Sequence, residues 1–198
     1  MNPILVASRK SSERTRFLER IAARSGSSIL VALAALELSV AVTFMAGGVI
    51  TRYHFLLFVA VLLATCVCRD RVEVEPLWRV GAASLVLSLL VIFASFVLAG
   101  STLDLSPDGQ SAQMLRISHL ASGWNPVYDA EFIDQPDGYI LATAETRFVG
   151  SGLGPHMAAA SAVKFLGNIE YGKGFNLVLM GAVMLLALAT TLGLSLHL

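Results

Sequence analysis

Charged residues and cysteines are both scarce in this sequence of 198 residues. Only 14% of the residues are Asp, Glu, Lys or Arg, whereas 56% are hydrophobic and the mean hydropathy is +0.72. Soluble domains usually carry about 25% charged residues, so this composition argues against a soluble globule. The 14 basic and 14 acidic residues cancel, and without a net positive field we expect no nucleic-acid partner.

The two cysteines, Cys66 and Cys68, are separated by one residue inside an apolar run. Two cysteines this close cannot staple a fold, and two are too few for a tetrahedral zinc site. We interpret them as small apolar fillers, with reversible acylation as the alternative. The four histidines do not form a facing pair at mid-depth of the predicted helices, so we expect no bound haem.

Long apolar stretches dominate the rest of the sequence. Four of them can each cross a bilayer core, which needs about 20 apolar residues in a helix. They cover residues 28–46, 49–68, 80–100 and 175–196. The sequence therefore predicts an all-α integral membrane protein with four transmembrane helices. Residues 1–27 form a basic segment before the first helix, a loop of residues 101–174 precedes the fourth, and the fourth lies within residues 175–198.

The charges that do occur are segregated along the chain. Basic residues gather before the first predicted helix and around the link between the second and third (Arg9, Lys10, Arg14, Arg16, Arg20, Arg24, Arg69, Arg71 and Arg79). The loop of residues 101–174 carries four basic and eight acidic residues. By the positive-inside rule both termini are cytoplasmic and this loop is extracytoplasmic. We expect a protein of the bacterial inner membrane.

The long loop is predicted to be an ordered cap on the membrane surface. Loops beyond about 12–15 residues usually carry function or are disordered, and seven aromatic residues argue against disorder here. One helix is predicted over residues 109–121, with Ser106 or Asp108 as its N-cap and Gly123 as its end. A second helix is predicted from Pro155 to Leu166, ended by Gly167, and residues 128–148 could pair as a small hairpin.

Three segments of this half of the chain carry a resemblance. They are residues 104–110 (DLSPDGQ), residues 123–128 (GWNPVY) and residues 165–174 (FLGNIEYGKG), the last leading into an apolar helix. Together they resemble the first large extracytoplasmic loop of membrane glycosyltransferases of the GT-C class. The resemblance covers roughly residues 102–196, about half of the chain. It implies a polytopic enzyme that transfers a sugar from a polyprenyl-phosphate donor.

The resemblance also implies a catalytic carboxylate. In that class a loop carboxylate just beyond a span acts on the acceptor, as a general base or as part of a divalent-cation site. Asp108 matches this position best, and Asp104 is the second candidate. The cofactor is otherwise unknown. Asp108 followed by Gly109 also has the pattern of an ordinary helix N-cap or turn, so this alternative stays open.

Three further polar residues are candidates for a site. Glu37 lies in the middle of the first predicted helix, where a charge costs about 3 kcal/mol, so it is either functional or a buried polar contact between helices. His156, at the start of the second loop helix, could touch a lipid phosphate or simply face water. Lys173 could pair with a diphosphate or extend its amine to the membrane surface.

Two functions from different classes follow. The first is a GT-C-like glycosyltransferase or its amino-terminal part, because 198 residues are too few to complete the lipid-donor cavity of that class. The second is a non-catalytic accessory subunit of a larger membrane complex, of energy-transducing or photosynthetic type. Gly81, Ala82, Ala83, Ser84 and Ser88 make one side of the third predicted helix suited to close contact with a partner helix. In either case we expect membrane lipid as the surroundings.

Overall fold

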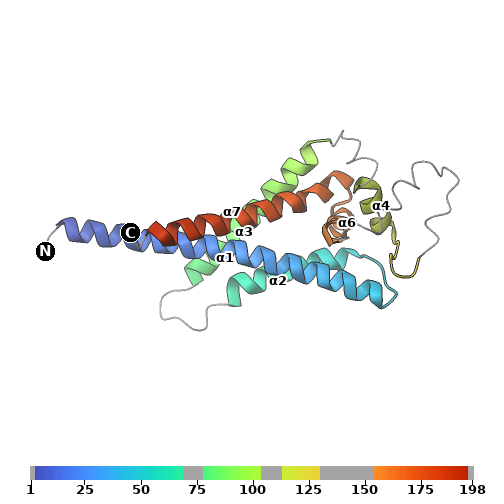
Figure 1. Ribbon diagram of the computed structural model, residues 1–198, viewed down its shortest axis with the longest axis horizontal. Coiled ribbons are helices and arrows are strands. Elements are labelled where there is room, and N and C mark those ends of the chain that lie inside the picture. The colour runs from blue at the N-terminus through green and yellow to red at the C-terminus, as the bar shows by residue number, and fades with distance from the viewer. Residues whose placement is uncertain (1–2, 69–77, 104–112, 130–153, 196–198) are drawn as a thin grey trace. The chain divides into compact units, whose positions relative to one another are not determined.

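The computed structural model describes residues 3–68, 78–103, 113–129 and 154–195 (Figure 1). Every regular element in these ranges is a helix, and they contain no strand. The elements in chain order are α1 (Pro3–Met45), α2 (Arg52–Val67), α3 (Trp78–Ser101), α4 (Leu115–Ser122), α6 (Gly154–Leu166), η4 (Ile169–Lys173) and α7 (Gly174–Ser195). The hairpin predicted over residues 128–148 lies almost wholly outside the described residues.

Three of the described helical segments are long and apolar enough to cross a membrane: Ser12–Met45, Trp78–Ser101 and Ile169–Ser195. This confirms the prediction of a helical protein with segments long and apolar enough to span a membrane. The second predicted span corresponds to α2, which is apolar but has only 16 residues. At 1.5 Å per residue it measures about 24 Å, shorter than a bilayer core of about 30 Å. The fourth crossing therefore stays a prediction.

The first helix is much longer than the predicted span. It begins at Pro3 and continues without a break through Ser25 to Ser28 into the apolar stretch. It ends at Met45, two residues before Gly47, which has a left-handed φ of +79°. The amides of Gly47 and Gly48 return to the carbonyls of Phe44 and Thr43 at 3.0 and 2.8 Å, the hydrogen bonds of a glycine C-cap.

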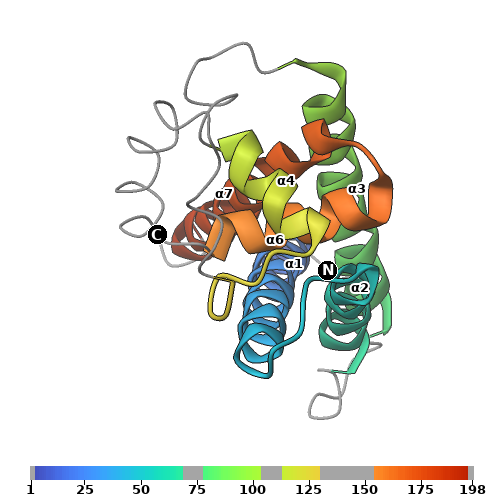
Figure 2. The ribbon, with the colours of Figure 1, turned by 90° about the vertical axis from the view of Figure 1, so that its right-hand side faces the viewer.

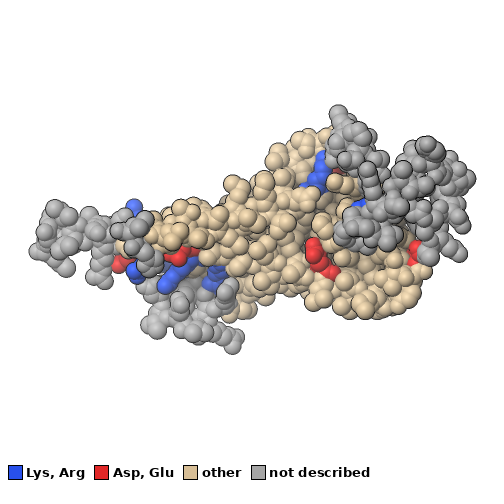
Figure 3. All heavy atoms as spheres, in the orientation of Figure 1, with Lys and Arg blue, Asp and Glu red and all other residues tan. Residues whose placement is uncertain are grey.

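The chain divides into two compact units. Unit 1 contains Met1–Ala32, Val59–Ala94 and Leu177–Leu198, and unit 2 contains Leu33–Phe58 and Ser95–Asn176. On the face that Figure 3 shows, charged side chains interrupt the described surface only in a few places. Large apolar side chains such as Leu38, Phe93 and Met184 are exposed, as expected for a surface that faces lipid.

Small residues hold the helices of unit 1 close together. Ser25 donates its hydroxyl to the Ser84 carbonyl at 3.0 Å, which joins α1 to α3. A Cβ at Gly26 would lie 2.8 Å from the Ala182 carbonyl oxygen, so only glycine permits this approach of α1 and α7. Ser84 and Ser88 are themselves buried. This part of the predicted small-residue face therefore packs within the chain.

Aromatic rings form the core of unit 2. Phe55 of α2 stacks on Phe165 of α6 with centroids 4.8 Å apart, and it also contacts the ring of Phe175 at the start of α7. Phe58, Phe96 and Tyr171 complete the cluster. Figures 1 and 2 together show that α6 lies across the direction of the long helices in this unit. The cluster thus fixes a short crosswise helix against the ends of three longer ones.

Candidate functional site

The loop between α3 and α7 folds into a small cap of α4, α6 and η4, all within unit 2 (Figure 2). Ile117 and Leu120 of α4 are buried, as is the run of small residues from Ala158 to Ala162 in α6. A Cβ on Gly172 would lie 3.2 Å from the Ile117 side chain and 3.3 Å from that of Ala159. Glycine at this position therefore lets η4 pack closely against both helices.

Both loop helices end where the sequence predicted. Gly123 follows α4 with a left-handed φ of +108°, and Gly167 follows α6 with a φ of +79°. The second helix begins at Gly154, one residue before the predicted Pro155. The predicted start of the first helix, with its Ser106 or Asp108 cap, lies outside the described residues. The described part of that helix begins at Leu115.

Residues 123–129, here called the anchor, tie the cap to the turn between α1 and α2. Asn125 is only 3% exposed, and its side-chain nitrogen Nδ2 donates to the carbonyls of Phe44 at 3.1 Å and Gly48 at 2.8 Å. The hydroxyl of Tyr128 donates to the Met45 carbonyl at 2.8 Å. Phe44 and Met45 belong to the last turn of α1, whose carbonyls lack partners within the helix. The anchor thus caps the end of α1.

The anchor is also held by its own hydrogen bonds. The Asn125 side-chain oxygen accepts from the amide of Val127 at 2.9 Å, which is an Asx turn. The Asp129 carboxylate accepts from the backbone amide of Asn125 at 2.8 Å, and the Trp124 indole donates to the Asp129 carbonyl at 3.0 Å. These bonds fix the orientation of Asn125, whose side chain contacts the turn between α1 and α2. The segment that carries the resemblance at residues 123–128 is therefore a built structural element.

The receiving turn is ordered by His54, which is buried. The Thr51 amide donates to its Nδ1 at 3.0 Å, so Nδ1 is an acceptor and Nε2 carries the proton. Nε2 then donates to the Thr43 hydroxyl at 3.0 Å, and that hydroxyl donates to the Ser39 carbonyl. A histidine three residues after the N-cap Thr51 replaces the Glu or Gln of a capping box. The sequence contains this signal as Thr-x-x-His, although the expectation for the histidines concerned only haem.

Glu37 has surroundings that the sequence did not indicate. It lies eight residues before the end of α1, about 12 Å along the helix. A Cβ on Gly154, the first residue of α6, would be 3.2 Å from its carboxylate. The N-terminus of a helix favours a nearby negative charge. The start of α6 therefore lies beside the Glu37 carboxylate, which favours a role for Glu37 in holding the cap.

The two predicted phosphate contacts are found at separate positions. Lys173 forms an ion pair with Glu170 and donates to the Thr102 carbonyl at 2.6 Å, which connects η4 to the end of α3. Its amine is thus already engaged by the protein. His156 is half-buried in the first turn of α6, near the residue that faces Glu37. A phosphate contact for either residue stays a prediction.

The predicted catalytic carboxylates, Asp104 and Asp108, lie outside the described residues. They belong to the segment between the end of α3 at Ser101 and the start of α4 at Leu115. In the described part of the chain no three His, Cys, Asp or Glu side chains come together as metal ligands. A divalent-cation site that includes Asp104 or Asp108 stays a prediction.

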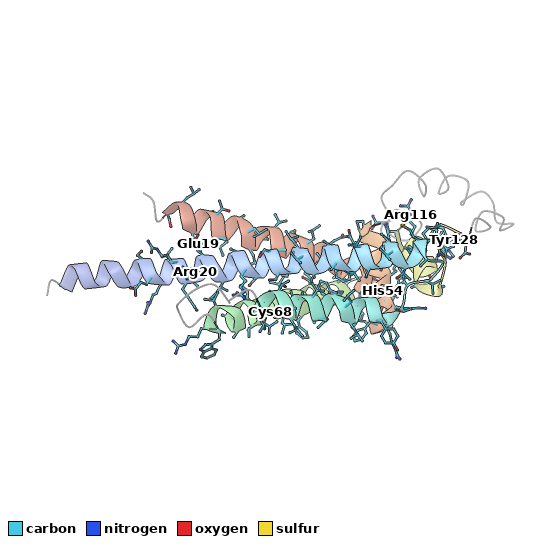
Figure 4. The ribbon with its side chains drawn as sticks, turned by 90° about the horizontal axis from the view of Figure 1, so that it is seen from below. Glu19, Arg20, His54, Cys68, Arg116 and Tyr128 are labelled. Atoms are coloured by element: carbon cyan, nitrogen blue, oxygen red, sulfur yellow. The ribbon has the colours of Figure 1, made fainter. Side chains whose placement is uncertain are left out.

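Burial also changes the chemistry of α4. It lowers the pKa of Arg116, which is 5% exposed, and it lowers the pKa of the His119 imidazole. Figure 4 places Arg116, Tyr128 and His54 at the cap end of unit 2. The folded cap therefore holds His119 in its neutral form near pH 7.

This predicts that the cap loses stability in mild acid. Since the folded pKa of His119 is lowered, the unfolded chain binds more protons below a pH of about 6.5, and stability falls as the pH decreases through that value. We expect the melting temperature of the wild type to fall more than that of His119→Asn between about pH 7.5 and pH 5.5. Thermal unfolding in detergent at both pH values measures this difference. Equal falls in the two proteins would contradict the assignment.

Comparisons of this chain with protein-family profiles, with curated proteins and with solved structures found no match.

Proposed function

We propose that the chain is a GT-C-like membrane glycosyltransferase, or the amino-terminal part of one, that uses a polyprenyl-phosphate-linked sugar. Asp108 is the carboxylate that acts on the acceptor, and Asp104 is the second candidate. The observation that carries this proposal is the cap. An acidic segment after α3 leads into α4, the anchor, α6 and η4, and the chain then returns through α7.

Two of the three segments that carry the resemblance have built roles in this cap. The anchor joins it to the end of α1, and η4 holds the end of α3 through Lys173. A rigid cap at the membrane face is what this chemistry needs, because catalytic groups must be held in a fixed geometry beside the lipid-linked phosphate. This supports a role for the loop in positioning reactants.

The proposal includes a topology. We place the protein in a bacterial inner membrane with both termini cytoplasmic, α2 as the fourth crossing and the cap outside. Basic residues before and after the α1–α2 hairpin support this orientation. The loop carboxylates then face the side on which enzymes of this class use lipid-linked sugars.

Cysteine labelling tests the topology directly. In a background without Cys66 and Cys68, a cysteine replacing Ser151 should react with a membrane-impermeant maleimide in intact cells. A cysteine replacing Ser12 should react only after permeabilisation, because the basic start of α1 remains in the cytoplasm. The reverse pattern would overturn both the topology and the transferase proposal.

The activity is tested with membranes that contain the full chain. They are incubated with polyprenyl-phosphate sugars, and transfer to added acceptors is compared with membranes that lack the chain. Transfer above this background supports the enzyme. Absence of transfer with every donor would leave only the second candidate.

The second candidate is a non-catalytic subunit of a larger membrane complex. The observation that favours it is the outward face of the last helix, since only 17% of the most apolar part of Ile169–Ser195 is buried within the chain. Further helices could cover that face. Native mass measurement after gentle extraction decides this, because a chain that migrates alone has no stoichiometric partner.

A further inference from the structure

An open groove of about 380 Å³ lies between α1 and α2 within unit 1. Its volume is at the lower end of the range of about 300–1,000 Å³ that small-molecule sites occupy. Its surface is almost entirely apolar. The lining side chains are Ser27, Ser28 and Val31 of α1, Ala64 and Thr65 of α2, and Cys68, which follows α2. Small side chains on both helices leave this space open.

The groove is also lined by a thiol, that of Cys68. Cys68, labelled in Figure 4, is exposed. Cys66, two residues earlier, is fully buried. Cys68 comes directly after the last residue of α2, and Arg69 and Arg71 follow it in the sequence. Cysteines at such a boundary between an apolar helix and basic residues are the usual sites of S-acylation. Cys68 is accessible to an acyl donor and Cys66 is not.

Ser28 provides an independent observation in the same groove. It is 2% exposed, and among the described residues its hydroxyl has no hydrogen-bond partner. A buried hydroxyl normally has one. The carbonyl oxygen of an acyl thioester is a suitable acceptor for such a donor. The groove thus combines an apolar wall with the Ser28 hydroxyl. Hydrocarbon alone offers this hydroxyl no hydrogen-bond partner.

We propose that Cys68 is S-acylated and that its fatty acyl chain lies in this groove. Ala64 lines the groove one helical turn before Cys68, on the side of the apolar part of α2. If α2 crosses the membrane as proposed, an acyl chain attached to the sulfur enters the bilayer in this direction. In the reaction the Cys68 thiolate attacks the carbonyl carbon of an acyl-coenzyme A. A new carbon–sulfur bond forms, the bond to coenzyme A breaks, and the coenzyme A thiolate leaves and takes up the proton released by Cys68.

This inference is independent of glycosyl transfer, and two matched cysteine variants test it. Membranes with the full chain are incubated with palmitoyl-coenzyme A that carries a terminal alkyne, and the label is detected after attachment of a fluorophore. Wild type and Cys66→Ser should be labelled, and neutral hydroxylamine should remove the label because it cleaves thioesters. Cys68→Ser should carry about tenfold less label. An unlabelled wild type, or equal loss in both variants, would overturn the proposal.

The position of the acyl chain is tested by filling the groove with larger side chains. Thr65→Phe and Ala64→Phe keep the thiol but occupy the space beside it. Both should lower acyl labelling several-fold while Cys68 still reacts fully with a small maleimide, which also shows that the variants fold. If acylation is undiminished although the groove is filled, the acyl chain does not lie in the groove and the proposal fails.

Discussion

Replacement of Asp108 by asparagine is expected to lower sugar transfer by about 100-fold or more, the usual contribution of a general base. An amide has nearly the volume of the carboxylate, but it does not accept a proton from the acceptor hydroxyl and it binds a divalent cation weakly. Asp108→Glu should recover part of the activity if the carboxylate itself is what the reaction needs. Initial rates at saturating donor, in membranes with matched amounts of each variant, measure the effect.

The controls for this prediction come from the same loop. Asp137→Asn changes an acidic residue outside the three segments that carry the resemblance, so it should transfer sugar at the wild-type rate. A chelator separates the two roles of Asp108, because it lowers wild-type activity only if the carboxylate holds a cation. Wild-type turnover in Asp108→Asn would remove this residue from the mechanism and return it to the role of a helix cap.

The ends of the loop helices were predictable because the signals for them are local. Pro155 and Gly167 bracket α6, and Gly123 ends α4 in the left-handed conformation that glycine allows. The length of α1 was not predictable in the same way. Hydropathy marks the part of a helix inside a bilayer, and the Ser25 to Ser28 stretch resembles a break. Gly26 is nevertheless helical, and its missing Cβ lets α1 pack closely against Ala182 of α7. A local window of the sequence does not reveal that contact.

The candidate site shows the same division between local and distant information. The sequence identified Glu37 as a residue that needs an explanation, because a mid-span charge is costly. It did not indicate that the start of α6 lies beside it, since Gly154 is more than a hundred residues away. For Lys173 the sequence suggested a diphosphate or the membrane surface as its surroundings, and it did not indicate the contacts with Glu170 and the Thr102 carbonyl. These partners depend on how the loop folds, and hydropathy does not encode that.

The largest effect on the cap is expected from Asn125. Asn125→Ala removes both donors that reach the carbonyls of Phe44 and Gly48. The Phe44 carbonyl still accepts from the Gly47 amide, so the larger cost arises at the Gly48 carbonyl, where an acceptor left without a partner costs about 1–3 kcal/mol. We therefore expect the free energy of unfolding to fall by about 1–3 kcal/mol, less if water reaches the turn. Thermal unfolding in detergent measures the fall, and faster proteolysis within residues 101–174 should accompany it.

Two matched variants determine whether Asn125 acts through these hydrogen bonds. Asn125→Asp keeps the size and the oxygen that accepts from Val127, but it sets a carboxylate oxygen against two carbonyls, so it should be at least as destabilising as Asn125→Ala. Tyr128→Phe removes a single bond at an exposed position and should cost only about 0.5–1.5 kcal/mol. If Asn125→Asp unfolds at the wild-type temperature, the anchor does not hold the cap through its donors, and the rigid geometry on which the transferase proposal depends must have another source.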